Sequence, residues 1–283
     1  MCEMCEMYGD PKYGGGRWYL NPKNYGRQLY TVHRPGERRK VFGEDPELAM
    51  GALMWKALSS KWEDPDHFDE NVREFSEANL WAGGSYVITL EEAFQVVELS
   101  YPIAAMQCMC RTALRAEEET NMDEYTCTCI GPGCLKWERW PERYKGGVEF
   151  MTVEQAKEWL TKLDKEGFMH LIMVLEQNYV GGICNCDYPD CLAIRDRLDY
   201  GTIPSLHKGH YVASIDYDQC NGCGICMQRC HYGALRFEYS YAMNKPNIDQ
   251  FKCFGCGMCS TGCPRGAITM VERESIPLLK GVW

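Results

Sequence analysis

The sequence predicts an α+β protein of two domains, an N-terminal α/β cysteine-rich domain over residues 44–210 and a smaller domain over residues 211–275. Three observations support this prediction. The chain has 283 residues, which exceeds one small domain and suits two. In the first domain, a helix, a strand and a Cys-x-Cys pair follow one another twice. In the second, one cysteine pattern occurs twice at an offset of 33 residues, the separation of Cys220 and Cys253.

Two terminal segments flank these domains. Residues 1–43 are expected to form an arm, and residues 276–283 an apolar tail that packs back on the protein or on a partner. The arm contains a Cys-x2-Cys pair, Cys2 and Cys5. These two thiols are candidate metal ligands, but two ligands do not complete a site, and free thiols are the alternative.

The first domain begins with helical spacing of apolar residues over residues 45–80, which predicts two amphipathic helices separated near Asp64 and Pro65. A capping box at residue 89 opens a further helix, and residues 103–109 follow as a strand. A second capping box at residue 152 opens the next helix, which Gly167 ends, and residues 168–175 follow as a buried strand. Because each strand leads to a Cys-x-Cys pair, we expect both pairs at the same end of the domain.

The second domain contains two cysteine runs with the spacing C-x2-C-x2-C-x3-C, at residues 220–230 and 253–263. Three thiolates at this spacing lie on a tight loop that wraps three corners of a [4Fe–4S] cluster, and the other run supplies the fourth corner. The predicted ligand sets are Cys220, Cys223, Cys226 with Cys263, and Cys253, Cys256, Cys259 with Cys230. Zinc is disfavoured here because zinc sites use cysteine pairs without a third, regularly spaced cysteine.

These runs resemble the bacterial-type dicluster ferredoxin domain, which carries two [4Fe–4S] clusters. The resemblance implies a compact, pseudo-twofold fold that transfers single electrons. One departure from the family is His231, which follows Cys230 where the family has proline. This change leaves ligation intact and concerns only the local turn and the reduction potential.

Eight further cysteines lie upstream. The motif C-x-C-x4-C occurs twice, and the Cys-x-Cys pair of residues 108–110 precedes both copies. The upstream cysteines are Cys108, Cys110, Cys127, Cys129, Cys134, Cys184, Cys186 and Cys191. We expect the two thiolates of a Cys-x-Cys pair to point to opposite sides of a strand, so that the pair Cys108 and Cys110 either serves two sites, as the fourth ligand of each triplet, or bends around one site. The motif favours one or two additional clusters, with structural zinc or redox-active thiols as alternatives.

The upstream half resembles a group of iron–sulfur proteins of anaerobes that are known mainly as 4Fe–4S ferredoxin-domain proteins. The residues that carry the resemblance are at 1–5, 18–25, 108–111 and 181–193. It covers most of the chain and implies no assigned substrate. Relatives carry a histidine after the N-terminal cysteine pair, whereas Tyr8 and Gly9 stand there in this chain, which weakens a metal site at Cys2 and Cys5.

Composition and charge narrow the functional classes. No signal-peptide pattern and no apolar run of membrane-spanning length occur, so the 18 cysteines are expected as cluster thiolates in a reducing cytoplasm. Residues 41–130 contain 5 basic and 18 acidic residues. This acidic segment forms either a solvated face or a docking surface for a redox partner with a basic patch. Nucleic-acid binding is disfavoured because no sustained basic patch with interleaved aromatics occurs.

We therefore expect a multi-cluster iron–sulfur electron-transfer protein, or a non-catalytic subunit, that relays single electrons to or from a partner oxidoreductase in anaerobic metabolism. No dinucleotide fingerprint occurs, so the partner is expected to be a flavin-, molybdenum- or tungsten-dependent subunit or a soluble ferredoxin. Two alternatives remain. One is a redox enzyme with an open-coordination cluster at the upstream cysteines, and the other is a zinc-stabilised adaptor fused to a ferredoxin.

Overall fold

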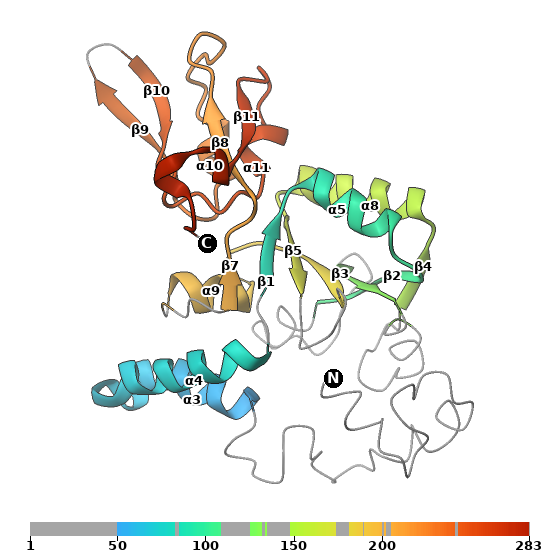
Figure 1. Cartoon of the computed structure of the whole chain (residues 1–283), viewed down its shortest axis with the longest axis vertical. Helices are drawn as coiled ribbons and strands as arrows, with labels where there is room; N and C mark the ends of the chain where they lie inside the picture. The colour runs from blue at the N-terminus through green and yellow to red at the C-terminus, as the bar shows by residue number, and fades with distance from the viewer. Residues whose placement is uncertain are drawn as a thin grey trace.

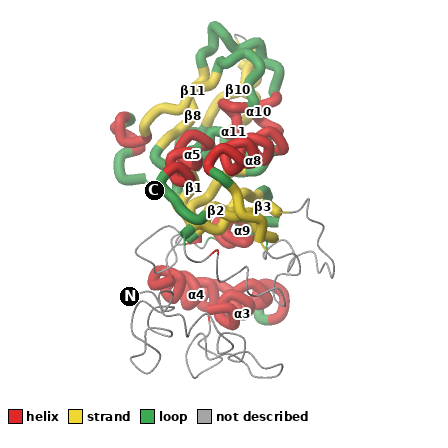
Figure 2. Tube along the Cα trace, turned by 90° about the vertical axis from the view of Figure 1, so that its right-hand side faces the viewer, coloured by secondary structure: helices red, strands yellow, loops and turns green. Residues whose placement is uncertain are grey.

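The computed structural model has three successive parts, which lie one above another in both views (Figure 1; Figure 2). A helical hairpin lies at one end, a seven-stranded sheet with its helices lies in the middle, and a C-terminal module lies at the other end. The structure describes residues 50–82, 85–108, 125–131, 134, 148–173, 181–188, 190–199, 201, 205–240 and 243–282. The predictions for the arm with Cys2 and Cys5, and for Cys110, fall outside these residues.

The helical hairpin consists of α3 (Met50–Glu63) and α4 (Phe68–Ala82), joined by the 3-10 turn η4 (Pro65–His67). Proline at the start of this turn costs no hydrogen bond, because the first N–H groups of a helix have no intrahelical partner. Lys56 Nζ donates to Glu74 Oε2 across the hairpin at 2.8 Å. The two predicted helices and the break between them are confirmed.

The central sheet has the strand order β4-β2-β3-β6-β5-β1-β7. Its strands are β1 (Ser85–Ile88), β2 (Ile103–Gln107), β3 (Tyr125–Ile130), β4 (Val148–Met151), β5 (Met169–Met173), β6 (Gly182–Cys186) and β7 (Leu206–His207). All neighbours are antiparallel except β1 and β7. The α+β class is confirmed, but the α/β arrangement expected for the first domain was wrong. Consecutive strands such as β5 and β6 pair directly, whereas an α/β sheet is parallel and needs crossover helices.

Helices α5 (Leu90–Glu98) and α8 (Val153–Glu166) pack side by side on one face of this sheet (Figure 1). Both begin with the predicted capping boxes, in which Thr89 exchanges hydrogen bonds with Glu92, and Thr152 with Gln155. Gly167 ends α8 in the left-handed conformation, as predicted. The apolar residues of these helices meet alternate side chains of the sheet, which fixes the helix-covered face.

The opposite face of the sheet is covered by α9 (Leu192–Leu198) and the C-terminal module. Val87 and Leu171 project from the sheet into a buried core with Ile194 of α9. Tyr232 and Met258 of the module belong to the same core. The module and the sheet therefore share one hydrophobic core.

The C-terminal module pairs β8 (Tyr211–Ile215) with β11 (Ile268–Glu272), and β9 (Leu235–Ser240) with β10 (Met243–Ile248). Two single-turn helices, α10 (Ile225–Gln228) and α11 (Met258–Thr261), complete it. A shift of 33 residues superposes the range of α10 on that of α11, and the start of β9 on the start of β11. The sequence repeat is therefore also a repeat of elements.

The chain ends in two 3-10 turns, η7 (Arg273–Ser275) and η8 (Pro277–Leu279). Leu279 is buried in the core of the module with Val212 and Ala213. Of the two alternatives for the tail, the described residues thus show packing on the protein itself. Among the helices of the described ranges, none has both the length and the apolar composition needed to cross a membrane.

Candidate metal centres

The two predicted ligand loops precede α10 and α11 and share one backbone geometry. Gly222 and Gly255 have φ values of 75° and 83°, in the left-handed region that favours glycine. A Cβ on Gly255 would lie 2.2 Å from the carbonyl oxygen of Tyr211, and one on Gly222 would lie 2.5 Å from that of Asn244. Tyr211 and Asn244 are also 33 residues apart, so each loop is held against the equivalent strand. No side chain fits at either glycine.

The outer set is the predicted ligand group Cys220, Cys223, Cys226 and Cys263. Cys223 is exposed, Cys220 and Cys263 are half-buried, and only Cys226 is buried. Burial, together with the nearby Cys220 and Cys223, raises the pKa of Cys226 to about 11. The four thiols thus lie close to one another and near the protein surface.

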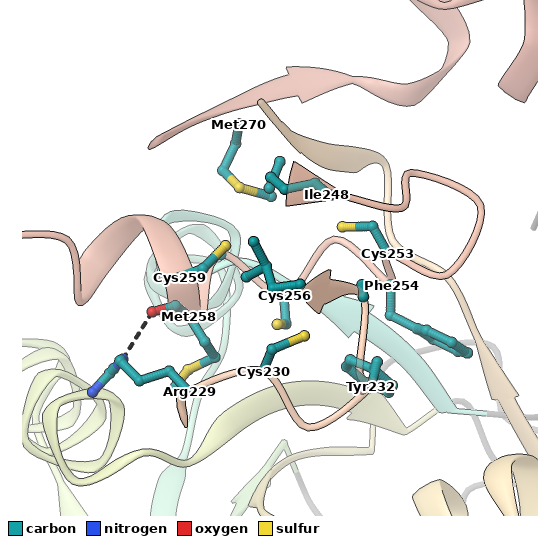
Figure 3. Close-up of a pocket in the computed structure, with 14 residues that line it drawn as sticks. Arg229, Cys230, Tyr232, Ile248, Cys253, Phe254, Cys256, Met258, Cys259 and Met270 are labelled. Atoms are coloured by element: carbon teal, nitrogen blue, oxygen red, sulfur yellow. Dashed lines mark hydrogen bonds between the residues drawn. The ribbon is translucent and has the colours of Figure 1, made fainter. Parts of the chain in front are cut away.

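The inner set is the predicted ligand group Cys230, Cys253, Cys256 and Cys259. Its members are buried except for the half-buried Cys230. Burial is the main reason that the pKa of Cys259 is raised to about 12, and the nearby thiols of Cys253 and Cys230 also contribute to this rise. All four line one pocket, whose other lining side chains are mainly apolar (Figure 3).

Backbone N–H groups contact sulfur atoms in both sets. The Ala267 N–H donates to Cys263 Sγ at 3.4 Å. Burial raises the pKa of Cys253, and the N–H groups of Ala213 and Gly255 oppose this rise. Such N–H donors stabilise thiolates and the clusters that thiolates hold. Two groups of four thiols, each with backbone donors, fit two [4Fe–4S] clusters, with the ligand assignment itself remaining a prediction.

The upstream cysteines of the described residues gather on the sheet face opposite α5 and α8. Cys127 of β3 pairs directly with Cys184 of β6, so both side chains project from the same face. Residues two apart in a strand also share a face, which places Cys129 and Cys186 beside them. The expectation that the thiolates of a Cys-x-Cys pair point to opposite sides was therefore wrong for both β3 and β6.

Contacts between the sulfurs divide these cysteines into two groups. Hydrogen bonds with Cys108 and Cys184 raise the pKa of Cys127. Hydrogen bonds with Cys108 and Cys191 raise the pKa of Cys186. Cys108 thus joins the two sequence triplets into one upstream thiol group, which comprises Cys108, Cys127, Cys184, Cys186 and Cys191.

The remaining two described cysteines form a separate pair. A hydrogen bond with Cys134 raises the pKa of Cys129, and both side chains are buried. Cys134 Sγ also donates to the Pro102 carbonyl oxygen at 3.5 Å. The structure therefore splits the predicted triplet of residues 127–134. Within the described ranges, no three His, Cys, Asp or Glu side chains converge on the position of a single metal ion.

Tyr232 lies in the same buried core as Cys256 of the inner set and Cys186 and Cys191 of the upstream thiol group. Its ring is buried, stacks on Phe254 at a centroid distance of 4.1 Å, and its hydroxyl donates to Met169 Sδ at 2.7 Å. Burial raises the pKa of Tyr232, and the thiols of Cys256 and Cys191 raise it further. One aromatic ring therefore has an inner-set sulfur and an upstream sulfur in its immediate electrostatic environment.

The segment around Cys230 anchors the module to the end of α8. Arg229 Nη2 donates to the Asp164 carbonyl oxygen at 2.6 Å, and Arg229 Nε to the Met258 carbonyl oxygen at 2.8 Å (Figure 3). His231 Nε2 donates to the Gly167 carbonyl oxygen at 2.8 Å, which leaves Nδ1 to accept from the Tyr188 N–H at 3.3 Å. The residue at the usual proline position thus bonds to the other domain, a role that sequence reasoning missed.

Comparison with known families agrees with this geometry. Residues 213–270 match the family model of the 4Fe-4S dicluster domain. The resemblance of the C-terminal module to the dicluster ferredoxin domain is thereby confirmed, and the match supports iron–sulfur electron transfer with [4Fe–4S] clusters. No curated protein gives a significant match to the chain.

Proposed function

We propose that the chain is a multi-cluster iron–sulfur protein that relays single electrons between a redox partner at the outer set and a third cluster at the upstream thiol group. The observation that carries this proposal is the single buried core in which Tyr232 lies together with Cys256 of the inner set and with Cys186 and Cys191 of the upstream thiol group. A [4Fe–4S] cluster supplies a one-electron couple when bound. The protein's part is to hold such groups close together and to exclude water between them.

Burial sets the order of the three sites. Cys223 is exposed, so a partner can approach the outer set directly. Cys253, Cys256 and Cys259 are buried, which removes the inner set from direct contact with a partner. Cys186 and Cys191 of the upstream thiol group lie in the core that the sheet and the module share, next to the inner set. The order is therefore surface, outer set, inner set and upstream thiol group.

The donor chemistry of the upstream thiol group supports a cluster there. Its five described members are all cysteines, of which Cys127, Cys184 and Cys186 lie on one face of the sheet, and thiolates are the ligands that iron–sulfur clusters prefer. We propose that four of them hold the third cluster. Cys129 and Cys134 need additional ligands, such as Cys110, to hold a fourth. Structural zinc remains the competing occupant.

The proposed partner is a flavin-, molybdenum- or tungsten-dependent oxidoreductase subunit, or a soluble ferredoxin, of anaerobic metabolism. The acidic segment of residues 41–130 supports a partner with a basic surface. The isolated chain is expected to show no substrate turnover. Turnover by the chain alone would instead favour an enzyme with an open-coordination cluster.

Metal analysis of anaerobically purified protein tests the proposal, with Cys186→Ser and Cys223→Ser as paired variants. Wild type is expected to contain about 12 to 16 iron atoms per chain, because each cluster has four. Cys186→Ser should remove about four of them and leave the spectrum of the dicluster module unchanged, whereas Cys223→Ser should alter that spectrum. About eight iron atoms with stoichiometric zinc would contradict the relay and favour the adaptor.

A further inference from the structure

Two buried cations adjoin the inner set. Arg273 is fully buried, and its guanidinium donates to the carbonyl oxygens of Gly209, Tyr211 and Cys253 at 2.9 to 3.0 Å. Its Nη1 is buried and has no hydrogen-bond partner in the structure. Lys208 is 7% exposed, and its Nζ donates to the Phe251 carbonyl oxygen at 2.6 Å. Both side chains therefore end among the backbone carbonyls of the inner ligand loop.

Neither cation forms an ion pair with a carboxylate among the described residues, and Asp249 favours the charged form of Lys208 only from a longer distance. Carbonyl oxygens satisfy hydrogen bonds but carry no net charge. A buried charge without a counter-ion is strongly disfavoured. Burial accordingly lowers the pKa of both Lys208 and Arg273, and the two cations also repel each other. Such an arrangement needs an anion close by.

The inner set provides that anion when it holds a cluster. Four thiolates make the site anionic, and one-electron reduction adds a further negative charge to it. Cys253 already contributes favourably to the charged forms of Arg273 and Lys208. We infer that Arg273 and Lys208 are the counter-charges of the inner cluster and raise its reduction potential. This inference rests on the proposed function, because it requires a cluster at the inner set.

The internal repeat does not reproduce these two cations at the equivalent positions of the outer set, where the described cation beside Gly222 is Lys245, which also acts on Asp216. The 33-residue shift places Ser240 at the position equivalent to Arg273, and Tyr241 at the position equivalent to Lys208. Neither residue carries a positive charge. The outer set therefore has the same ligand spacing and loop geometry as the inner set but lacks both counter-charges. The two clusters are expected to differ in potential, although the sequence spacing of their ligands is identical.

The test is an anaerobic redox titration of the iron-loaded protein, followed by electron paramagnetic resonance. Arg273→Gln should lower the inner midpoint potential by about 59 mV or more, which is a tenfold change in the equilibrium constant of a one-electron couple. Arg273→Lys keeps the positive charge and should shift the inner midpoint potential by less than about 59 mV. Arg265→Gln is the matched control, since Arg265 is exposed and lies two residues after Cys263 of the outer set. Cys223→Ser identifies the outer signal.

The outcomes separate this inference from the proposed function. Wild-type protein without two ferredoxin-type signals would overturn the proposed function itself. Two normal signals, with Arg273→Gln shifting the inner potential no more than Arg265→Gln does, would overturn only the role of Arg273. If Arg273→Gln fails to retain iron, Lys208→Gln provides the same measurement and should lower the inner potential in the same direction. An unchanged potential in that variant would also overturn the inference.

Discussion

Replacement of Arg229 by methionine should loosen the attachment of the module to the sheet domain. Arg229 makes three hydrogen bonds to α8, to the carbonyl oxygens of Asp164 and Lys165 and to Asp164 Oδ2, at 2.6, 3.2 and 3.5 Å. The side chains of Arg229 and Asp164 are 17% and 6% exposed. Methionine keeps most of the apolar stem and removes the donors, so that the Asp164 carboxylate keeps its hydrogen bond from Thr261 Oγ1 but loses its cation.

The expected cost is about 3 kcal/mol. Removing one partner of a buried ion pair costs roughly 3–5 kcal/mol, and the lower end applies because Arg229 is partly reached by water. Burial raises the pKa of Asp164 while Arg229 opposes the rise, so the variant carboxyl takes up a proton more easily, which limits the loss. With a slope of about 3 kcal/mol per M of urea, the unfolding midpoint should fall by about 1 M.

Anaerobic urea unfolding of the loaded protein, followed by tryptophan fluorescence and by cluster absorbance, measures this midpoint. Lys162→Met is the matched control on the same helix, because Lys162 forms only an exposed pair with Glu166 at 3.8 Å, worth less than about 1 kcal/mol. Adding Asp164→Asn to the Arg229 variant should recover part of the loss, since no buried charge then lacks a partner. Equal midpoints for Arg229→Met and Lys162→Met would refute this account of the anchor.

Two further predictions concern the ligand loops. An iron chelator should remove iron in two phases, and the outer cluster should be lost first because Cys223 is exposed whereas Cys256 is buried. The Cys223→Ser variant should lack the fast phase. A single phase of iron loss in the wild-type protein would contradict the order of the sites. Gly255→Ala should lower the free energy of unfolding by about 3 kcal/mol or more, because its Cβ would lie 2.2 Å from the Tyr211 carbonyl oxygen. Gly233→Ala is the matched control and should lower it by about 1 kcal/mol, because Gly233 has a φ of 60° but no atom within 4 Å of an added Cβ. Thermal loss of cluster absorbance compares the two alanine variants, and equal losses would contradict the close approach.

The features that the sequence predicted correctly are local ones. A capping box needs only residues three apart, and a ligand loop needs only cysteines at fixed short spacing, so Thr89, Thr152 and the runs that begin at Cys220 and Cys253 could be interpreted without a fold. Sheet order and strand direction depend on pairing between distant segments. The direct pairing of Cys127 with Cys184 could not be read from either C-x-C-x4-C motif.

The residues that sequence reasoning missed act across long separations. Arg229 and His231 bond to residues 64 and 65 positions away, and Arg273 to Gly209, which is also 64 positions away. Arginine and histidine are common at protein surfaces, so the residue type alone did not indicate any of these contacts. Only His231 was visible as a departure, because it replaces the proline of the family, and its contact with Gly167 supplies a reason for the change.

Docking of the module on the sheet makes two similar cluster sites different. The repeat gives both sites the same cysteine spacing and the same glycine contacts with a neighbouring strand. Attachment through Arg229 and His231 then covers only the half that contains Cys256, while Cys223 stays exposed. A symmetric, fully exposed module could exchange electrons at either end. Here the covered end packs against Cys184 and Cys186 of β6, so in the proposed relay an electron that enters at the exposed outer set moves inward through the core that contains Tyr232.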